Sequence, residues 1–459
     1  MHPDWTIRTI QECASDEPYS TQIGPFGNKI RAKIYTPTGA PVLRGTQVNT
    51  DGRYHDGDYV FVSEEYAEEE LQKFVCEADD IILCHKGTLG KIGIIPRNGK
   101  FDRYIMGNSM MKVRCNRDLI EPLYLYYFLC SGAGQHYLFS RVSQVGVPQI
   151  QRPLTTLREC EVPLPPIEEQ RAIASILGAL DDKIELNRRM HATLESLARA
   201  IFKSWFVDFD PVKINAGQMP ASSAIPTTHD PKVLDLFPST FQDSELGPIP
   251  DGWLYHSLPD VTTFREGPGI LAKDFHDEGV PLIRLAGLKN DVSLLAGCNF
   301  LDPAKVEKKW SHFRLEKGDV LLSTSASLGR VAEVNDEAVG AIPYTGLIGF
   351  RPIESITNRR YIRHYLTSSH FQEQVEAMGV GSVLKHFGPT HLKQMKMLVP
   401  PLAIQNEFKQ AVAKMDEMIS KNLLQSAQLA ANRDTLLPQL LSGELPVPKG
   451  LTATEEALV

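Results

Sequence analysis

An internal repeat constrains this chain more than any other feature, because residues from about 30 to 206 recur roughly 240 to 235 positions later. Residues 32–35 return as residues 272–275, and Arg44 returns as Arg284. Other matched pairs follow in the same order: Gly39 and Gly279, Pro41 and Pro281, Phe61 and Phe300, Phe74 and Phe313, Glu77 and Glu316, Asp80 and Asp319, Leu83 and Leu322, Leu89 and Leu328, and Gly90 and Gly329. Two such units predict a pseudo-twofold molecule, which suits a bipartite target such as duplex DNA.

Each copy ends in a long segment with helical periodicity. Its apolar positions alternate in steps of four and three, which is the seam spacing of a coiled coil. The first seam comprises Ile173, Leu177, Leu180, Ile184, Asn187, His191, Leu194, Ala198, Ile201 and Trp205. The second comprises Phe408, Val412, Met415, Ile419, Asn422, Ser426, Leu429, Arg433, Leu436 and Leu440. At 1.5 Å of rise per residue, a helix of about forty residues is roughly 60 Å long.

Each helix has an apolar stripe too long for one small domain to bury, so we expect the two helices to pair antiparallel. The residues expected to make this pairing are Leu177, Leu180, Ile184 and Asn187 of the first helix and Val412, Met415, Ile419 and Asn422 of the second. A buried amide on such a seam favours one register at some cost in stability. The alternative is that both Asn side chains face solvent in an irregular bundle. Apolar Ile176 and Phe202 are expected on exposed faces of the helices, which a pair of helices would leave only half covered.

Composition is that of an ordinary globular protein. The 459 residues are 42% hydrophobic and 23% charged, and no apolar run approaches the roughly 18 residues of a membrane span. The start of the chain has no signal-peptide pattern, so we expect a cytoplasmic protein. Seven cysteines without a C-x-x-C pair predict reduced, mostly buried thiols. The net charge of -8 argues against a simple DNA-coating protein, although the cation-rich residues 91–117 leave room for a local basic face.

Short strand-like runs punctuated by Gly and Pro, mixed with a few helices, predict an α+β fold for each globular unit. Strands are expected at residues 60–62, 80–84, 91–95, 110–113 and 319–323, and helices at residues 122–130 and 359–367. The predicted domains are a first globular unit at 1–164, a helical region at 165–206, a linker at 207–250, a second globular unit at 251–399, a distal helical region at 400–445 and a tail at 446–459.

Four segments resemble one known family, the specificity subunits of type I restriction-modification systems. Residues 164–170 (LPPIEEQ), 180–184 (LDDKI) and 202–211 (FKSWFVDFDP) are similar to the central helical region of these subunits. Residues 436–445 (LLPQLLSGEL) are similar to the end of their distal helical region. The chain departs from the pattern at residues 403–407, where AIQNE replaces the Glu-Glu-Gln of the first helix.

The resemblance implies a subunit with two target-recognition domains, each reading half of an asymmetric, bipartite sequence in double-stranded DNA, with paired helices as a spacer. It also implies partners: two modification (methyltransferase) subunits that dock on the helical regions, and restriction subunits that join this core. S-adenosylmethionine, ATP and Mg would belong to those partners and not to this chain.

The usual catalytic motifs are missing from the sequence. There is no G-x-x-x-x-G-K-[ST] phosphate loop, because residues 87–91 (GTLGK) are too short. No Asn-Pro-Pro-aromatic or Asp-Pro-Pro-aromatic tetrapeptide occurs, and the histidines lack paired metal-ligand spacing. We therefore expect a non-catalytic chain without a metal site.

Two places in each copy have the composition of a DNA-contact loop, namely hydrogen-bonding side chains with a cation. One is the turn at 84–91, which matches 323–330; the other is the loop at 141–152, whose counterpart is 379–389. The candidate residues are Lys86, Thr88, Lys91, Arg141, Gln144, Gln149, Gln151, Arg152, Ser325, Ser327, Arg330, Ser382, Lys385 and His386. The alternatives are a structural β-turn for the first place and a solvated loop for the second.

Two other functions remain open at this point. A structural adaptor whose duplicated domains bind proteins would fit the weak overall charge. A self-contained methyltransferase would require the purified chain to bind S-adenosylmethionine by itself. The loop composition and the family motifs favour DNA recognition over both.

Overall fold

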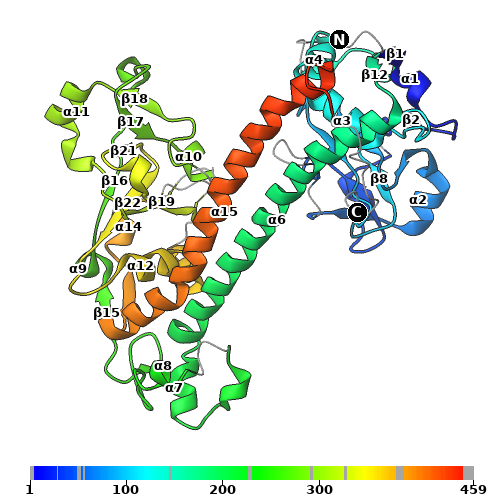
Figure 1. Cartoon of the computed structure of the whole chain (residues 1–459). Coiled ribbons are helices and arrows are strands. Elements are labelled where there is room, and N and C mark those ends of the chain that lie inside the picture. Colours follow the sequence, from blue (N-terminus) through cyan, green and yellow to red (C-terminus); the bar gives the residue numbers. More distant parts are fainter. Residues whose placement is uncertain are drawn as a thin grey trace. The chain divides into compact units, whose positions relative to one another are not determined.

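A computed structural model describes residues 5–27, 29–48, 53–54, 57–143, 147–225, 230–289, 293–324, 328–378 and 387–447. The chain divides into two compact units. The first combines Met1–Asn187 with Gln425–Val459, and the second is Arg188–Leu424. Each unit has small sheets and short helices on parts of two long helices, α6 (Ile167–Phe206) and α15 (Leu402–Ser442) (Figure 1).

The globular part of the first unit is α+β, as predicted. Its strands are β1 (Thr6–Thr9), β2 (Thr21–Ile23), β3 (Ala40–Leu43), β4 (Val60–Val62), β5 (Val75–Cys76), β6 (Ile81–Cys84), β7 (Ile92–Ile94), β8 (Tyr104–Met106), β9 (Met110–Val113), β10 (Val142–Ser143), β11 (Gln149–Ile150) and β12 (Glu161–Leu164). Its helices are α1 (Ile10–Cys13), α2 (Glu64–Glu70), α3 (Pro122–Cys130), α4 (Gly132–Phe139) and α5 (Pro153–Arg158). Two four-stranded sheets have the orders β2-β9-β6-β7 and β4-β3-β8-β5.

The second unit follows the same plan. Its strands are β13 (Phe241–Gln242), β14 (Ile249–Pro250), β15 (Leu254–Ser257), β16 (Thr262–Glu266), β17 (Val280–Ile283), β18 (Asn299–Leu301), β19 (Val320–Ser323), β20 (Val331–Glu333), β21 (Ile342–Pro343), β22 (Leu347–Pro352) and β23 (Lys396–Val399). Its helices are α7 (Asp210–Asn215), α8 (Pro231–Leu234), α9 (Leu258–Val261), α10 (Leu285–Lys289), α11 (Pro303–Lys309), α12 (Arg359–Leu366), α13 (Ser369–Ala377) and α14 (Pro389–Leu392). The sheet β16-β22-β19-β20 has the order of its counterpart in the first unit.

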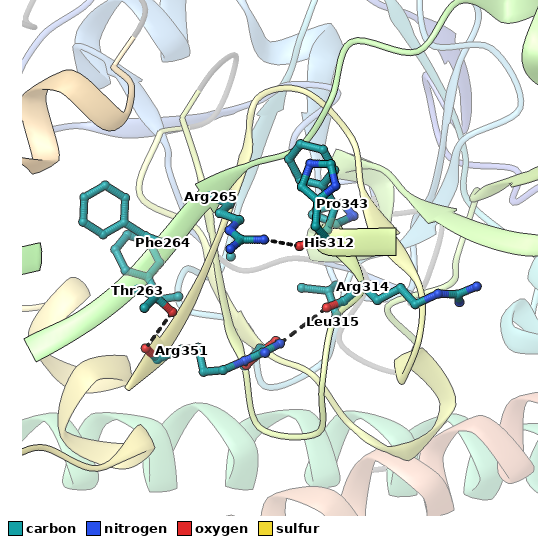
Figure 2. Close-up of a pocket in the computed structure, with 12 residues that line it drawn as sticks. Thr263, Phe264, Arg265, His312, Arg314, Leu315, Pro343 and Arg351 are labelled. Atoms are coloured by element: carbon teal, nitrogen blue, oxygen red, sulfur yellow. Dashed lines mark hydrogen bonds and ion pairs between the residues drawn. The ribbon is translucent and has the colours of Figure 1, made fainter. Parts of the chain in front are cut away.

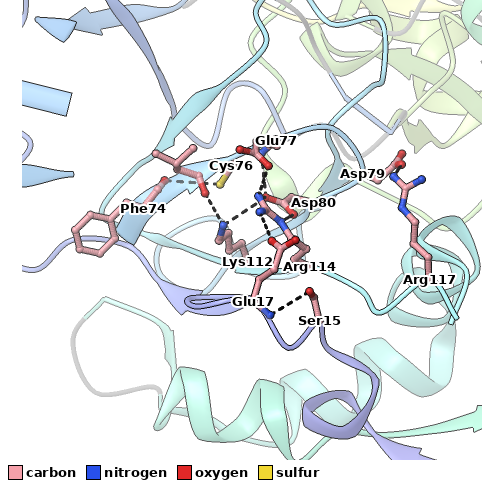
Figure 3. A network of polar contacts seen from close by, with 11 residues as sticks. Ser15, Glu17, Phe74, Cys76, Glu77, Asp79, Asp80, Lys112, Arg114 and Arg117 are labelled. Atoms are coloured by element: carbon pink, nitrogen blue, oxygen red, sulfur yellow. Dashed lines mark hydrogen bonds and ion pairs between the residues drawn. The ribbon is translucent and has the colours of Figure 1, made fainter. Parts of the chain in front are cut away.

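A buried carboxylate explains one pair of positions in the repeat. Asp80 has no exposed side-chain surface; it accepts from the Glu77 N–H at 2.9 Å and binds Arg114 in a bidentate manner at 2.8 and 2.9 Å (Figure 3). In the second unit, Asp319 accepts from the Glu316 N–H at 2.8 Å and binds Arg351 in a bidentate manner at 2.9 and 2.7 Å. A carboxylate buried beside a strand needs such partners, because an unpaired one would be costly to desolvate.

Helix α3 shows how local sequence fixes an element. Pro122 occupies its first turn, where a missing N–H costs nothing, and the run PLYLYYFLC is buried on nearly every side. Tyr124 donates its hydroxyl proton to the Pro163 carbonyl at 2.7 Å, and Tyr361 of α12 makes the same bond to Leu398 at 2.6 Å. The two helices therefore occupy equivalent places in their units.

Cysteine burial agrees with the sequence. All seven thiols are free, and five of them are buried: Cys13, Cys76, Cys84, Cys115 and Cys160. Burial raises the pKa of the Cys13 thiol to about 11 and that of Cys76 to about 12. These thiols are protonated at neutral pH and act as small apolar side chains of the core.

The long helices pack antiparallel within each unit. In the first unit, Asp181 of α6 accepts from Arg433 of α15 at 2.7 Å, and Asn187, further along α6, donates to Gln425 at 3.0 Å. Asn187 is only 1% exposed and also donates to Ser426 at 3.2 Å. Asn187 therefore lies on the helix seam and does not face solvent. Among the other seam positions, Leu177, Val412 and Ile419 are buried, and Leu180, Ile184, Met415 and Asn422 are half-buried.

In the second unit the same two helices hold the globular part through charges. Arg363 of α12 pairs with Glu195 of α6 at 2.5 Å, and Arg360 pairs with Asp416 of α15 at 3.0 Å. One expectation about this region was wrong. Phe202 was expected on an exposed apolar stripe, but it is 4% exposed and stacks on His364, with ring centroids 5.8 Å apart.

Residues of the segment expected to be a linker join the core of the second unit. Val212, Val233 and Phe237 are buried with Trp205 and Trp253 in one apolar cluster. The rings of Trp205 and Phe237 lie 5.6 Å apart in an edge-to-face arrangement. None of the helices in the described residues is both long and apolar enough to cross a membrane.

Candidate nucleic-acid interface

The strand order of each main sheet gathers several loops at one end. In the first unit, Ile23 at the end of β2 pairs with Met111, and Cys84 at the end of β6 pairs with Met110. The loops that follow β2 and β6 and the loop that precedes β9 therefore meet. The backbone N–H of His85 donates to the Ser109 carbonyl at 2.9 Å and fixes two of them together.

The two loops predicted for DNA contact in the first unit lie side by side at this end. Gly87 donates its N–H to the Pro148 carbonyl at 3.1 Å, and Ile150 donates to the His85 carbonyl at 2.9 Å. Lys86 and Gln149 form an antiparallel bridge between the two loops. The β6–β7 turn and the β10–β11 hairpin thus form one surface, which we call the readout surface of the first unit.

Most of the predicted residues on this surface are exposed. Lys86, Thr88, Gln149, Gln151 and Arg152 are exposed, and Lys91 is half-exposed. Neighbouring His85 is buried, and this burial lowers the pKa of its imidazole, which is therefore neutral at pH 7. The cation of the turn is supplied by Lys86.

Arg141 belongs to the same surface but is partly engaged. Its guanidinium lies 3.9 Å from the centroid of the Tyr137 ring and donates to the Tyr137 carbonyl at 3.3 Å. A stacked guanidinium loses little further freedom when it binds a phosphate or a base edge. Gln144, the remaining residue predicted in this loop, lies outside the described residues.

In the second unit the corresponding turn has the same backbone frame. Thr324 donates its N–H to Gly346 at 2.9 Å, as His85 does to Ser109, and Arg330 donates its N–H to the Ser323 hydroxyl at 3.0 Å. The Arg330 side chain is exposed. The other predicted residues of this unit lie outside the described residues; they are Ser325, Ser327, Ser382, Lys385 and His386.

The cation-rich stretch at 91–117 is not a free basic face. Most of its cations pair with acids from other segments: Arg97 and Arg117 with Asp79, Arg103 with Glu64 and Glu68, and Lys112 and Arg114 with Asp80. Within the described ranges, no ion pair joins Lys86, Lys91, Arg152 or Arg330 to an acid. These four cations are therefore available for phosphate.

Sequence reasoning missed the loops that share this end of the sheet in the first unit. Asn108 and Ser109 are exposed there, next to a pocket of about 180 Å³ that also has Tyr35, Arg44 and Gly107 in its lining. No local motif marks these residues. Their position depends on strand pairing between distant segments, which the sequence does not display.

A second pocket, in the second unit, lies at the opposite end of the sheet. Figure 2 shows Arg265, Arg314 and Arg351 around it. Two of these charges are paired with acids, Arg351 with Asp319 at 2.7 Å and Arg314 with Glu307 at 3.5 Å, and Arg265 donates to the His312 carbonyl. This pocket is part of the structural frame and not of the readout surface.

The exposed side chains at this end are amides, hydroxyls and cations, which are groups that suit base edges and phosphates. In the part of the chain that the structure describes, no cluster of three or more His, Cys, Asp or Glu side chains could hold a metal ion.

Comparison with known families decides the assignment. The family model of the type I restriction modification DNA specificity domain matches the chain twice, at residues 32–196 and 250–429. The chain belongs to the type I restriction-modification specificity subunits. Such subunits are non-catalytic and have no cofactor of their own, and this chain is the DNA specificity subunit of a type I system.

Two relatives match across most of this specificity subunit. The HindI specificity subunit of Haemophilus influenzae is 24% identical over 413 residues, which are 78% of this chain and 87% of the relative. The MjaIX specificity subunit of Methanocaldococcus jannaschii is 23% identical over 399 residues, which are 85% of this chain and 84% of the relative. The crystal structure of the S subunit from M. genitalium has the same fold, with a TM-score of 0.51, 16% identity and coverage of 96% and 97% of the two chains.

Proposed function

We propose that this specificity subunit binds double-stranded DNA at a bipartite, asymmetric target, with one half-site read by each globular unit. One observation carries the proposal. The β6–β7 turn and the β10–β11 hairpin of the first unit are hydrogen-bonded into one exposed surface that presents Lys86, Gln149 and Gln151. Amides suit base edges and the ammonium suits phosphate.

The repeated plan supports the bipartite target, because the described ends of the matching turn are bonded alike: Ser323 donates its N–H to the Arg330 carbonyl, as Cys84 does to Lys91. We assign residues 1–164 and 251–399 as target-recognition domains. Residues 165–206 and 400–445 are then helical spacers, 207–250 the connector and 446–459 a tail. Since the two units differ in sequence, their half-sites would differ as well.

The partners would be the other subunits of the system: two modification subunits, which methylate adenine, and the ATP-dependent restriction subunits. S-adenosylmethionine, ATP and Mg would be bound by those partners. Apolar side chains remain exposed along the helices at Leu186, Leu197, Met418 and Leu424. Such side chains suit coverage by a docked protein.

The direct test is to map methylated adenines in cells with and without this gene. We expect one split motif, with a fixed gap and different halves, to be methylated only when the gene is present. Restoring the gene from a plasmid should restore the same motif. Unchanged methylation in the deletion strain would contradict the proposal.

A further inference from the structure

The two units differ at one position beside their turns. In the first unit, Leu43 of β3 pairs with Met106 of β8, and the next residue is Gly107. In the second unit, Ile283 of β17 pairs with Pro343 of β21, and the next residue is Tyr344. The matching registers make Gly107 and Tyr344 equivalent.

In the second unit the aromatic ring of Tyr344 is held in place from several directions. The Arg284 guanidinium lies over this ring, 5.0 Å from its centroid, and 5.8 Å from the centroid of Phe275. The Tyr344 hydroxyl donates to the Ile270 carbonyl at 3.2 Å. This place in the repeat therefore accepts a flat six-membered ring against a guanidinium.

In the first unit the same place is a pocket. Arg44 and Tyr35 hold the repeat positions of Arg284 and Phe275, and both line the pocket of about 180 Å³ together with Gly107. Cavities of about 150 Å³ already accept benzene. The Arg44 Nε is buried and has no hydrogen-bond partner among the described residues, while the Nη2 of the same guanidinium donates to the Asp58 carbonyl. Among the described residues, the first unit thus has the guanidinium and the aromatic neighbour but no ring at the place of Tyr344.

The pocket adjoins the readout surface. Asn108 and Ser109 at its edge are exposed, and Ser109 accepts from the His85 N–H in the β6–β7 turn. A Cβ on Gly45, another lining residue, would lie 3.1 Å from the Thr88 hydroxyl oxygen. A group that leaves DNA bound at the turn would have a short path into the pocket.

We propose that this pocket takes a nucleobase that has left the stack of the bound duplex. The inference rests on the proposed function. A guanidinium and a phenol ring stack on any base. Ser109 and the side-chain oxygen of Asn108 offer hydrogen bonds to the edge of the base, while the Asn108 nitrogen donates to the Ile30 carbonyl at 3.1 Å. The lining also includes the apolar residues Val42, Leu43 and Met110, which suits a ring better than a phosphate. Stacking here would offset the few kcal/mol that unstacking a base costs.

The test compares two duplexes. One is fully paired, and the other has the same base pairs and one additional, bulged 2-aminopurine. The full-length chain should bind the bulged duplex about tenfold more tightly, because the base is already out of the stack. The fluorescence of the 2-aminopurine should fall on binding, because its ring stacks on Tyr35 and Arg44. Arg44→Ala and Tyr35→Leu should each reduce the preference to about twofold.

Arg284→Ala is the matched control, because its guanidinium covers the chain's own Tyr344 and should leave the preference at about tenfold. Circular dichroism checks that each variant is folded, and the two first-unit variants test the pocket independently. Equal affinity for both duplexes, or a preference that survives in both Arg44→Ala and Tyr35→Leu, overturns the inference. If neither duplex is bound, the proposed DNA binding fails; if both are bound equally, only the pocket inference fails.

Discussion

Lys86 and Gln149 are neighbours with different expected tasks. Their backbones form a bridge, and both side chains are exposed. Lys86→Ala should weaken binding to all duplexes similarly and lower the salt dependence by about one unit, because one phosphate contact is lost. Gln149→Ala should cost roughly 1 to 3 kcal/mol on the cognate site and leave binding to scrambled DNA unchanged.

Binding isotherms at several salt concentrations, on cognate and scrambled duplexes, distinguish the two tasks. Lys73→Ala is a suitable control, since Lys73 is exposed and lies just before β5, near the Asp80 end of the sheet. It should change neither affinity nor salt dependence. If Gln149→Ala weakens binding to both duplexes equally, the hairpin does not read the sequence.

His364 should make the second unit sensitive to acid. Burial, with a smaller contribution from the charge of Arg363, lowers the pKa of His364 to about 3. An unfolded histidine has a pKa near 6.5, so between about pH 6.5 and 3 the unfolded chain binds more protons than the folded one. The stabilisation from His364 is complete above pH 6.5 and falls progressively below it, by about 1 to 2 kcal/mol at pH 5.

Urea unfolding of the wild type and of His364→Phe at pH 7 and pH 5 measures this contribution. We expect the wild type to lose more stability on acidification than the variant, which keeps an aromatic ring against Phe202 and Phe408. The equivalent side chain in the first unit is Tyr127, which donates to Asp181 at 2.6 Å and does not titrate in this range. Identical pH dependence in both proteins would contradict the prediction.

At the scale of elements, α6 and α15 are the parts expected to set the gap in the target. Each helix passes from one compact unit to the other, with the divisions after Asn187 and after Leu424. Inserting seven residues at both points adds about 10 Å to each helix. The methylated motif should then tolerate a gap longer by about three base pairs of ~3.4 Å each.

Methylated-adenine sequencing in cells that carry the double insertion reads the new gap directly. A single insertion in α6 alone is the control. With only one helix lengthened, the contact of Asn187 with Gln425 and that of Trp205 with Phe408 cannot both keep their register, so modification should be abolished. An unchanged gap in the double insertion would mean that something other than the helices sets the spacing.

Elements with strong local signals were predictable from sequence. The helix expected at 122–130 matches α3, and the strand expected at 110–113 matches β9. The exposure of Phe202 was predicted wrongly because only the two paired helices were considered as neighbours of this face. Phe202 instead packs against α12, which belongs to the globular part of the second unit.

The candidate site was predictable only in pieces. The composition of the turn and of the hairpin is visible locally, but their contact depends on the order β2-β9-β6-β7 and on the bridge between Lys86 and Gln149. The pocket at Arg44 and Gly107 was not predictable, although Arg44 and Arg284 had been matched as repeats. The pocket lies where the second unit has the ring of Tyr344. Recognising that Gly107 is equivalent to Tyr344 requires the strand registers.

At the scale of the whole molecule, the two recognition units should be separable. Exchanging residues 1–164 for the equivalent unit of a relative should change one half of the methylated motif and leave the other half intact. The exchange must end at 164, because β12 pairs with β1 and a shorter segment would split this ladder. Sequencing of the methylated motif is the measurement, and simultaneous change of both halves would contradict modular reading.

The division of the chain also has a consequence for its synthesis. The second unit is one continuous segment, whereas the first needs Leu440 and Leu441, which lie in its apolar core with Leu177. Domains usually fold in the order in which they leave the ribosome. Here the unit whose residues emerge first cannot be completed until the last helix has been made, so the second unit should reach its native state before the first.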